Sequence, residues 1–441
     1  KRQICFLPIF DPEGKEKAKK KLRRTFPIFL ILALFLGNGP TTEGDDHRDY
    51  TRRGGTRWSY QVVDSVGLEG GHTSLALDAA GNAHISYYDG DTRDLKYARW
   101  TGTAWDIRTV DGEGGDDVGQ HTSLALDAAG RPHISYYDVT RGNLKYARWT
   151  GTTWATQAAD AGGDVGTNTS LALDAAGNPH ISYSDRTNYA LKYAHWTGGT
   201  WDIQTLASLG IQPYHTDRDT SLALDSAGQP HISFSPYISY YGPDFALNYA
   251  RWTGSTWDIQ TVAEWGDMGM YSSLALDAAG QPHISYSYLD IVQQDRQDGL
   301  RYAYWMGSAW EFQTVDSGYV GAHTTQALDA AGQPHISYQD GEGTMRKLKY
   351  AHWTGGDWAI QTVDVDSAVD VGEHTSLALD AAGQPHISYR AGTNLKYARL
   401  ISTARQVLLP LALHYDRTVL SMRLDEPEGA TTFRDSSVYQ N

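Results

Sequence analysis

Cysteine is almost missing from this chain. Of 441 residues only Cys5 is a cysteine, and it lies close to the first residue. Disulfide bonds and thiolate zinc sites are therefore excluded from the rest of the chain. The body of the protein must be held together by its own hydrophobic core.

Positive charge is scarce beyond residue 40. The whole chain has a formal net charge of −15, and residues 1–40 contain nine of its 37 Lys and Arg residues but only three of its 52 acids. The remainder has 28 basic and 49 acidic residues, a net charge of −21. So acidic a body repels phosphate backbones, and we expect no nucleic-acid partner.

Long apolar runs are absent except for the 11 residues at 26–36, well short of the roughly 20 that span a membrane. A basic stretch at 19–24 precedes this run and small residues follow it, a pattern that resembles a secretory signal. We therefore expect residues 1–40 to be a signal-like segment and residues 41–56 a linker. The protein is expected to be secreted or on the cell surface without a stable membrane span; an uncleaved signal anchor is the alternative.

Internal repetition is what the chain has in abundance. Four short segments recur in a fixed order, T-S-L-A-L-D, H-I-S-Y, L-K-Y-A and a run that begins with Trp, each in seven copies with small variations. The position of Leu75 recurs after 49, 47, 51, 52, 52 and 51 residues. Each segment is rich in aromatic and β-branched residues and alternates with period two, as strands do. Four strands in a repeat of this length are typical of a β-propeller blade.

The sequence predicts an all-β fold, a seven-bladed β-propeller of four-stranded antiparallel blades, over residues 57–400. The chain enters with a Trp-type segment at Trp58–Val63 and leaves this region after an L-K-Y-A-type segment at Leu395–Leu400. The N-terminal strand can therefore join the last blade and close the ring, which removes open sheet edges. Residues 401–441 are expected to form a C-terminal tail that is partly disordered.

The repeat spacing distinguishes the two rims of the predicted ring. The distances from Asp78 to His84 and from Leu95 to Trp105 are the same in every copy, whereas the other two connections range from 9 to 17 and from 16 to 21 residues. These connections define a uniform rim and a variable rim. Loops on a rigid scaffold carry most binding residues, so we expect function on the variable rim.

The largest departures from the repeat are neighbours on the variable rim, in blades four and five. Trp265, which lies in one of these loops, is the only one of the 14 tryptophans outside a repeat position. Aromatic faces stack on sugar C–H groups, while amides and carboxylates bind hydroxyls, so these loops are candidates for carbohydrate recognition. Packing of the loops on themselves is the alternative. The candidate ligand-binding residues are Tyr214, His215, Tyr237, Tyr240, Tyr241, Phe245, Trp265, Tyr271, Tyr288 and Arg296.

Two sets of histidines recur in the repeat. The seven equivalents of His84 each follow an Asp by six residues on the uniform rim, where a hydrogen bond within the blade is the simpler interpretation. A second set precedes the innermost strands and could face a central channel, but its spacing is not that of a metal site. This set consists of His72, His121, His323 and His374.

Acidic residues crowd the variable rim without a recognisable ligand pattern. The segment around Asp116 and Asp117 differs from a calcium-binding loop, and a solvated acidic face is the default interpretation. We therefore expect no metal, no cofactor and no catalytic residue, and leave weak calcium binding open.

The tandem units resemble those of uncharacterised secreted bacterial proteins with the pattern LALDxxGxPHISYYD…LKYAxW, over about residues 57–400. They are also distantly similar to the Asp-box repeats of sialidases, although the segment ALDAAGNPH retains the Asp and Gly and lacks the Trp. The resemblance implies a propeller, and no catalytic residue can be carried over from it.

The function we expect is that of a secreted, non-catalytic binding module, a monomer that recognises carbohydrate or another surface ligand on the variable rim of blades four and five. One alternative is a sialidase-like glycoside hydrolase or lyase, which needs two facing carboxylates. The other alternative is a protein–protein interaction scaffold. The candidate carboxylates for the enzyme are Asp244, Glu264, Asp267, Asp290 and Asp295.

Overall fold

The computed structural model describes residues 56–67, 70–208, 220–235, 246–263, 269–289, 298–341 and 346–402, together with three short strands nearer the C-terminus. All regular elements in these residues are strands. Within this part of the chain there is no helix long and apolar enough to cross a membrane. The signal-like segment and the linker up to residue 55 lie outside the described residues.

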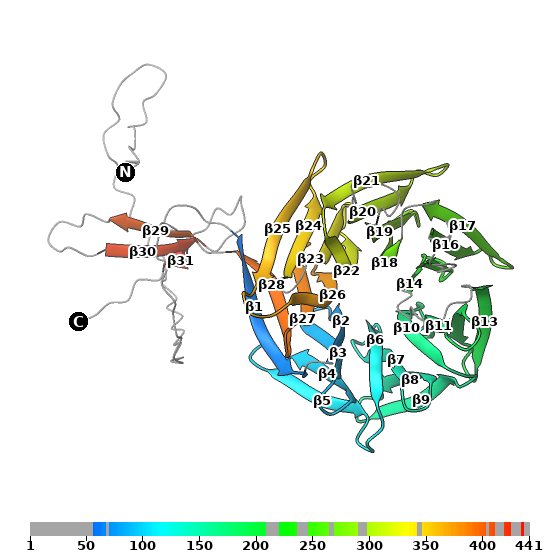
Figure 1. Cartoon of the computed structure of the whole chain (residues 1–441). Coiled ribbons are helices and arrows are strands. Elements are labelled where there is room, and N and C mark those ends of the chain that lie inside the picture. The colour runs from blue at the N-terminus through cyan, green and yellow to red at the C-terminus, as the bar shows by residue number, and fades with distance from the viewer. Residues whose placement is uncertain are drawn as a thin grey trace, which may run out of the picture. The chain divides into compact units, whose positions relative to one another are not determined.

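Seven sheets of four strands form a ring around a central channel (Figure 1). Blade one consists of β2 (Gly71–Leu77), β3 (Ala83–Asp89), β4 (Asp94–Trp100) and β5 (Trp105–Asp111). Blade two consists of β6 (Val118–Leu126), β7 (Pro132–Asp138), β8 (Asn143–Trp149) and β9 (Trp154–Asp160). Blade three consists of β10 (Val165–Leu173), β11 (Pro179–Asp185), β12 (Ala190–Trp196) and β13 (Trp201–Ser208). Blade four consists of β14 (Thr220–Leu224), β15 (Pro230–Phe234), β16 (Leu247–Trp252) and β17 (Trp257–Ala263).

The remaining blades follow the same order. Blade five consists of β18 (Met270–Leu276), β19 (Pro282–Leu289), β20 (Asp298–Trp305) and β21 (Trp310–Ser317). Blade six consists of β22 (Val320–Leu328), β23 (Pro334–Asp340), β24 (Lys347–Trp353) and β25 (Trp358–Val365). Blade seven consists of β26 (Val371–Leu379), β27 (Pro385–Ala391), β28 (Asn394–Ser402) and β1 (Thr56–Ser65). The predicted seven-bladed propeller is therefore confirmed.

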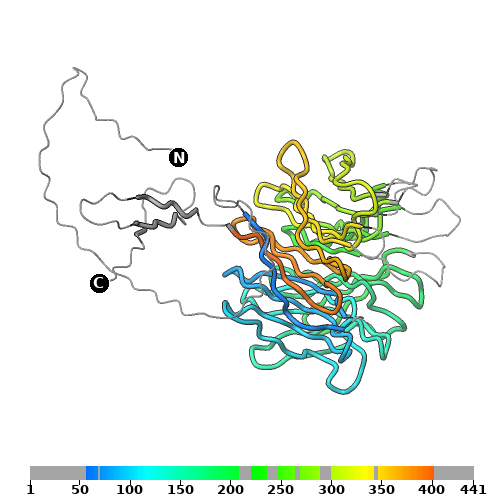
Figure 2. Tube along the Cα trace, turned by 60° about the vertical axis from the view of Figure 1, so that its left-hand side comes forward, coloured from blue at the N-terminus to red at the C-terminus, as the bar shows by residue number. Residues whose placement is uncertain are grey.

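The N-terminal strand closes the ring as predicted. β1 pairs antiparallel with β28, from Thr56 opposite Ser402 to Ser65 opposite Asn394. The blue N-terminal strand therefore runs beside the orange strand of blade seven (Figure 2). This pairing covers the outer edge of β28, which would otherwise be exposed.

The hydrophobic core is divided into seven parts, each lying between two neighbouring blades. In one of them Leu95 and Tyr97 of blade one pack against Ile134 and Tyr136 of blade two. Ile134 and Tyr136 are fully buried, because the second strand of a blade is covered on both faces by its neighbours. All seven residues of β7 are accordingly buried, the polar His133 and Ser135 included.

Hydroxyl groups of the T-S-L-A-L-D segment link the blades around the channel. The backbone N–H of Leu124 in blade two donates to Oγ of Ser74 in blade one at 3.0 Å, and Leu75 donates to Ser376 of blade seven at the same distance. The preceding hydroxyls make a second set of bonds between blades, which includes Thr122 with Ser86, Thr169 with Ser135, Thr220 with Ser182 and Ser337 with Thr375. The Ser and Thr residues of the innermost strands thus join neighbouring blades by hydrogen bonds.

The turns of the uniform rim repeat closely from blade to blade. The N–H of Asp78 donates to the carbonyl of Asn82 at 3.0 Å, and the other six copies of the turn have the same bond at the same length. Gly81 has a φ of +77°, a conformation that glycine adopts without steric cost. The uniform sequence spacing therefore reflects one hairpin geometry used seven times.

The region expected to be a partly disordered tail contains a separate three-stranded sheet. Its strands are β29 (Arg405–Pro410), β30 (Val419–Leu424) and β31 (Arg434–Asp435), in the order β29-β30-β31. The rest of residues 403–441 lies outside the described residues.

Candidate functional site

Most of the candidate ligand-binding residues fall outside the described part of the chain. The same holds for the five carboxylates considered for hydrolase or lyase chemistry, Asp244, Glu264, Asp267, Asp290 and Asp295. The candidate ligand residues outside the described ranges are Tyr214, His215, Tyr237, Tyr240, Tyr241, Phe245, Trp265 and Arg296. The structure describes Tyr271 and Tyr288.

Tyr288 lies in the core between blades four and five. Its side chain is 6% exposed and packs in a cluster that includes Leu247 and Val262. The guanidinium of Arg301 lies 4.1 Å from the centre of its ring. Its ring is therefore in contact with neighbours from blades four and five rather than presented to solvent.

Tyr271 lies at the mouth of the channel on the variable rim. It is near the start of β18 and has a φ of +52°, in the left-handed region. The register between β18 and β19 shifts at this point, between Met270 and Ser273, so Tyr271 occupies a bulge. Its ring centre is 4.8 Å from that of His323 in the next blade.

The same bulge recurs in other blades and gives the channel a ring of side chains. The rings of His72 and His374 are 4.2 Å apart, His72 and His121 are 4.5 Å apart, and His323 and His374 are 4.7 Å apart. The described residues at this position and their φ angles are His72 (+44°), His121 (+53°), Asn168 (+51°), Tyr271 (+52°), His323 (+51°) and His374 (+49°). We name this set the channel ring; it confirms that these histidines face the channel.

The channel ring surrounds a shallow cavity of about 230 Å³ that is lined below it by the Ser and Thr residues of the innermost strands. Burial, followed by the charge of Arg186, lowers the pKa of His121 to about 4. Burial and the neighbouring His72 lower the pKa of His323 to about 3. The imidazoles are therefore neutral near pH 7 and act as hydrogen-bonding and stacking groups.

A metal site in the channel ring is not supported. Among the described residues there is no group of three or more His, Cys, Asp or Glu side chains that could hold a metal ion. The acids of the variable rim are engaged with other side chains: Asp117 accepts a hydrogen bond from Tyr88 at 3.0 Å, and Asp116 pairs with Arg141.

Other carboxylates of the variable rim lie in networks between blades. Asp160 of blade two accepts hydrogen bonds from two residues of blade three, Tyr183 at 2.7 Å and Lys192 at 3.0 Å, and Lys192 also pairs with Asp185 at 3.0 Å. Burial would raise the pKa of Asp160, but the hydrogen bonds from Tyr183 and Lys192 outweigh it and lower that pKa. Matching Tyr–Asp–Lys sets surround Asp111, Asp316 and Asp364. Such satisfied carboxylates serve structure rather than acid–base chemistry.

The Asp–His pair of the uniform rim hydrogen-bonds within its own blade, as predicted. Nε2 of His84 lies 3.5 Å from Oδ2 of Asp78, and Nδ1 lies 2.5 Å from the hydroxyl of Tyr97. Because a carboxylate can only accept, Nε2 carries the proton and Nδ1 accepts the Tyr97 hydroxyl. Burial lowers the pKa of His84, so this geometry holds at neutral pH.

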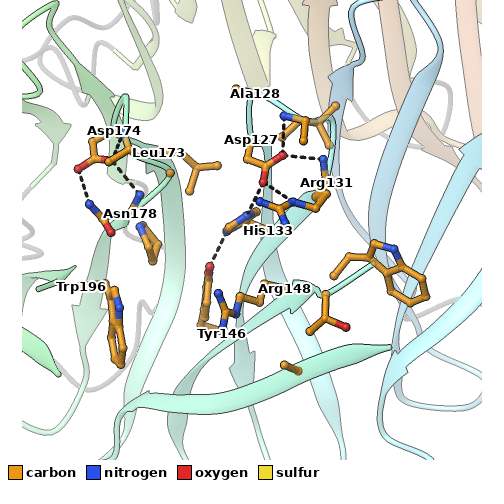
Figure 3. Close-up of a pocket in the computed structure, with 18 of the residues that line it drawn as sticks. Asp127, Ala128, Arg131, His133, Tyr146, Arg148, Leu173, Asp174, Asn178 and Trp196 are labelled. Carbon is orange, nitrogen blue, oxygen red and sulfur yellow. Dashed lines mark hydrogen bonds and ion pairs between the residues drawn. The ribbon is translucent and has the colours of Figure 1, made fainter. Parts of the chain in front are cut away.

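Sequence reasoning missed a pair of grooves on the uniform rim. The first groove, between blades one and two, has a volume of about 780 Å³, and the second, between blades two and three, about 820 Å³. Figure 3 shows the second groove, with Asp127, His133 and Tyr146 on one wall and Asp174 and Asn178 on the other. The uniform spacing of this rim does not indicate the grooves, because the loop lengths are the same in every blade. The blades differ instead in the residue type near the end of the third strand, which is Arg148 in blade two and His195 in blade three.

Comparison with known proteins places the fold among β-propellers. No protein-family model matches the chain, and no curated protein matches it. A structure of an ulvan lyase from a new polysaccharide lyase family, bound to -[GlcA(1-4)Rha3S]-, is 12% identical, with 76% of this chain and 95% of that chain covered and a TM-score of 0.55. This likeness shows a shared fold.

Two further solved structures are similar at lower scores. Penicillium chrysogenum α-L-arabinanase complexed with arabinobiose is 10% identical, with 78% of this chain and 97% of that chain covered and a TM-score of 0.47. SapL1 lectin in complex with alpha methyl fucoside is 14% identical, with 69% of this chain and 98% of that chain covered and a TM-score of 0.44.

Proposed function

We propose that this protein is a secreted, non-catalytic carbohydrate-binding propeller whose ligand site lies on the variable rim, at the channel mouth beside blades four and five. The observation that carries the proposal is the left-handed backbone of Tyr271 at that mouth. Its ring stands beside the imidazole of His323 and above the hydroxyls of the innermost strands.

The backbone of Tyr271 argues for a role of its side chain. Glycine is the residue with the lowest cost at a positive φ, Asn and Asp tolerate it, and a bulky side chain is held there at a cost on the order of 1 kcal/mol. The equivalent residue of blade three is Asn168, so the bulge itself does not need an aromatic ring. The backbone therefore does not account for the ring of Tyr271, and an aromatic face at a shallow polar cavity suits a sugar.

The similar folds support a carbohydrate ligand. Structures similar to this chain include a polysaccharide lyase, an arabinanase and a lectin, so the scaffold is compatible with carbohydrate binding or processing. The loops predicted to extend the site, with Trp265 at their centre, adjoin β18 in the sequence.

The test is a glycan array probed with the full chain, followed by calorimetric titration of the best ligand. Tyr271→Gly and Tyr271→Asn both keep the left-handed backbone and remove the ring. An aromatic stacking contact contributes about 0.5–1.5 kcal/mol beyond burial, so we expect affinity to fall on the order of tenfold, with no loss of thermal stability.

The matched control is Asn168→Gly, which makes the same kind of backbone change in blade three and should leave affinity unchanged. Tyr271 variants that bind as tightly as the wild type, or a chain that binds no glycan on the array, would show the proposal to be wrong.

A further inference from the structure

The two grooves of the uniform rim are equivalent sites one blade apart. The second groove lies between the hairpin that begins at Asp127 and the hairpin that begins at Asp174, and the first lies between the hairpins of Asp78 and Asp127. Their volumes of about 820 and 780 Å³ are within the range of roughly 300–1,000 Å³ found for small-molecule sites.

One residue near the end of the third strand decides whether the floor of a groove is covered. Blades three and six have a histidine there. The ring of His195 stacks on His180 and Tyr193, each at 5.7 Å and about 25° between planes, and His352 stacks in the same way in blade six. The ring thus lies over the buried His–Tyr pair.

Blades one and two have an arginine at this position instead, as do blades four and seven with Arg251 and Arg399. Arg99 is 50% exposed, and Arg148 is likewise exposed. No stacking of these side chains on the His–Tyr pair occurs in the described structure, so the pair remains part of the groove lining. In blades one and two the arginine therefore leaves the pair uncovered and supplies the groove with a cation.

The cation of the second groove is available to a ligand. The nearby Arg131 is held by Asp127 at 2.6 Å, and Arg99 of the first groove lies 3.7 Å from Asp78. By contrast, within the described residues no carboxylate lies within ion-pair distance of Arg148. Because the described acids near Arg148 are occupied elsewhere, its guanidinium presents donors suited to a carboxylate or a sulfate.

The rest of the second groove suits a sugar ring. Trp149 and Trp196 contribute indole surface, and the side chains of Asn178 and Gln157 contribute amides. Asn178 donates to Asp174 at 2.9 Å, which fixes its orientation (Figure 3). Apolar faces flanked by amides and a guanidinium match a saccharide that bears one negative charge.

We propose that the second groove binds an anionic saccharide residue through Arg148, and that the first groove repeats this site with lower affinity because Asp78 competes for Arg99. The two sites belong to the uniform rim and are independent of the site proposed around Tyr271.

The experiment is calorimetric titration of the full chain with three oligosaccharides of equal length, one built of uronates, one sulfated and one neutral. We expect the anionic ligands to bind, binding to weaken as salt is raised, and the neutral ligand to bind at least tenfold more weakly. The stronger of the two anionic ligands identifies whether the groove prefers carboxylate or sulfate.

Arg148→His is the decisive variant, because it installs the residue that blades three and six already accommodate. It should lower affinity for the anionic ligand at least tenfold without lowering the melting temperature, and His195→Arg should open a third groove and raise the number of ligands bound. An Arg148→His chain that binds like the wild type, or equal binding of neutral and anionic ligands, would overturn the proposal. Tyr271→Gly should leave binding of the anionic ligand in the second groove unchanged. The test of the groove is therefore separate from the test of the carbohydrate site proposed around Tyr271.

Discussion

Trp58 and Gln361 are separated by 303 residues in the chain and joined by a hydrogen bond, in which the indole Nε1 donates to Oε1 at 3.0 Å. The same bond joins Trp105 to Gln61 at 3.2 Å and Trp257 to Gln204 at 3.0 Å. The first residue of the outer strand in one blade thus binds the outer strand of the preceding blade. β1 makes this contact as β5, β17 and β25 do, although it comes from the other end of the propeller sequence.

Removing β1 should open the ring. A chain that begins at Gly67 lacks the partner of β28 along its whole length, so it exposes a sheet edge and the apolar face covered by Val63. We expect a lower melting temperature and concentration-dependent association, measured by calorimetry and light scattering. A chain that begins at Gly54 is the control and should behave as the full chain does. A monomer of unchanged stability from the shorter chain would contradict closure by β1.

Arg108→Gln should stabilise the protein. Nε1 of Trp154 is buried without a hydrogen-bond partner in the described structure, and the residue equivalent to Gln61 is Arg108, which cannot accept. Nε1 of Trp201 and of Trp310 is also unpaired there, although Gln157 and Gln260 stand at the equivalent positions, so the substitution tests whether an acceptor can reach Trp154. A glutamine supplies the missing acceptor, and one satisfied buried donor contributes about 1–3 kcal/mol. Denaturant unfolding of the variant should move to a higher midpoint.

The control for this substitution is Arg108→Lys, which also removes the guanidinium from above Trp149 but offers no acceptor. If Arg108→Lys gained as much stability as Arg108→Gln, the hydrogen bond to Trp154 would not be the cause.

The hydrogen bonds of Asp160 with Tyr183 and Lys192 should contribute to stability cooperatively. Asp160→Ala alone removes the acceptor of the Tyr183 hydroxyl and leaves Lys192 with Asp185 as its partner, a loss of about 1–3 kcal/mol for one unsatisfied buried group. At the junction of blades three and four the three equivalent positions hold Ala207 of blade three and Phe234 and Asn248 of blade four, so the Tyr–Asp–Lys set is absent there.

The triple variant Asp160→Ala, Tyr183→Phe and Lys192→Asn therefore copies a solution that the chain already contains. We expect it to be less destabilised than Asp160→Ala alone, which denaturant midpoints and a cycle of single and double variants would measure. Strictly additive losses would refute the view that the network is one cooperative unit.

The channel ring should make stability depend on pH in a defined window. Burial lowers the pKa of His121 to about 4, whereas an unfolded histidine titrates near 6.5. Between these values the unfolded state binds a proton that the folded state does not, so the free energy of unfolding falls as pH falls from about 6.5 to about 4. Above pH 6.5 this group contributes no slope.

His121→Asn should flatten this dependence, since Asn168 occupies the same backbone conformation in blade three. Asn168→His should steepen it by adding an imidazole to the ring. Thermal melts of the two variants and the wild type between pH 4 and 7.5 give the comparison, and the same slope in all three would mean that the channel ring does not titrate in this way.

The fold could be predicted from the sequence because the same pattern of four strand segments occurs seven times. The spacing from Asp78 to His84 corresponds to one hairpin, and its turn has the same hydrogen bonds in every copy. Closure of the ring by the N-terminal strand could also be predicted, because Trp58 begins an outer-strand segment that has no inner strands before it. The pairing of Asp78 with His84 followed from their positions across one turn.

Other features depend on contacts between blades, which no local pattern encodes. Tyr288 had the composition of a loop aromatic and lies in the core, because it occupies the strand position held in other blades by the buried Asp89, Asp138 and Asp185. Beside the second groove Arg148 leaves the pair of His133 and Tyr146 uncovered, whereas His195 covers the equivalent pair of blade three.

The amino-acid order by itself determined the number of blades, the antiparallel hairpins and the strand that seals the ring, since period and alternation are local properties of the chain. Only the tertiary structure decided which side chains meet around the channel and between neighbouring blades. The physical reason is distance: His72 and His374 lie 4.2 Å apart in space but at opposite ends of the propeller sequence, and a curved sheet must close before they become neighbours.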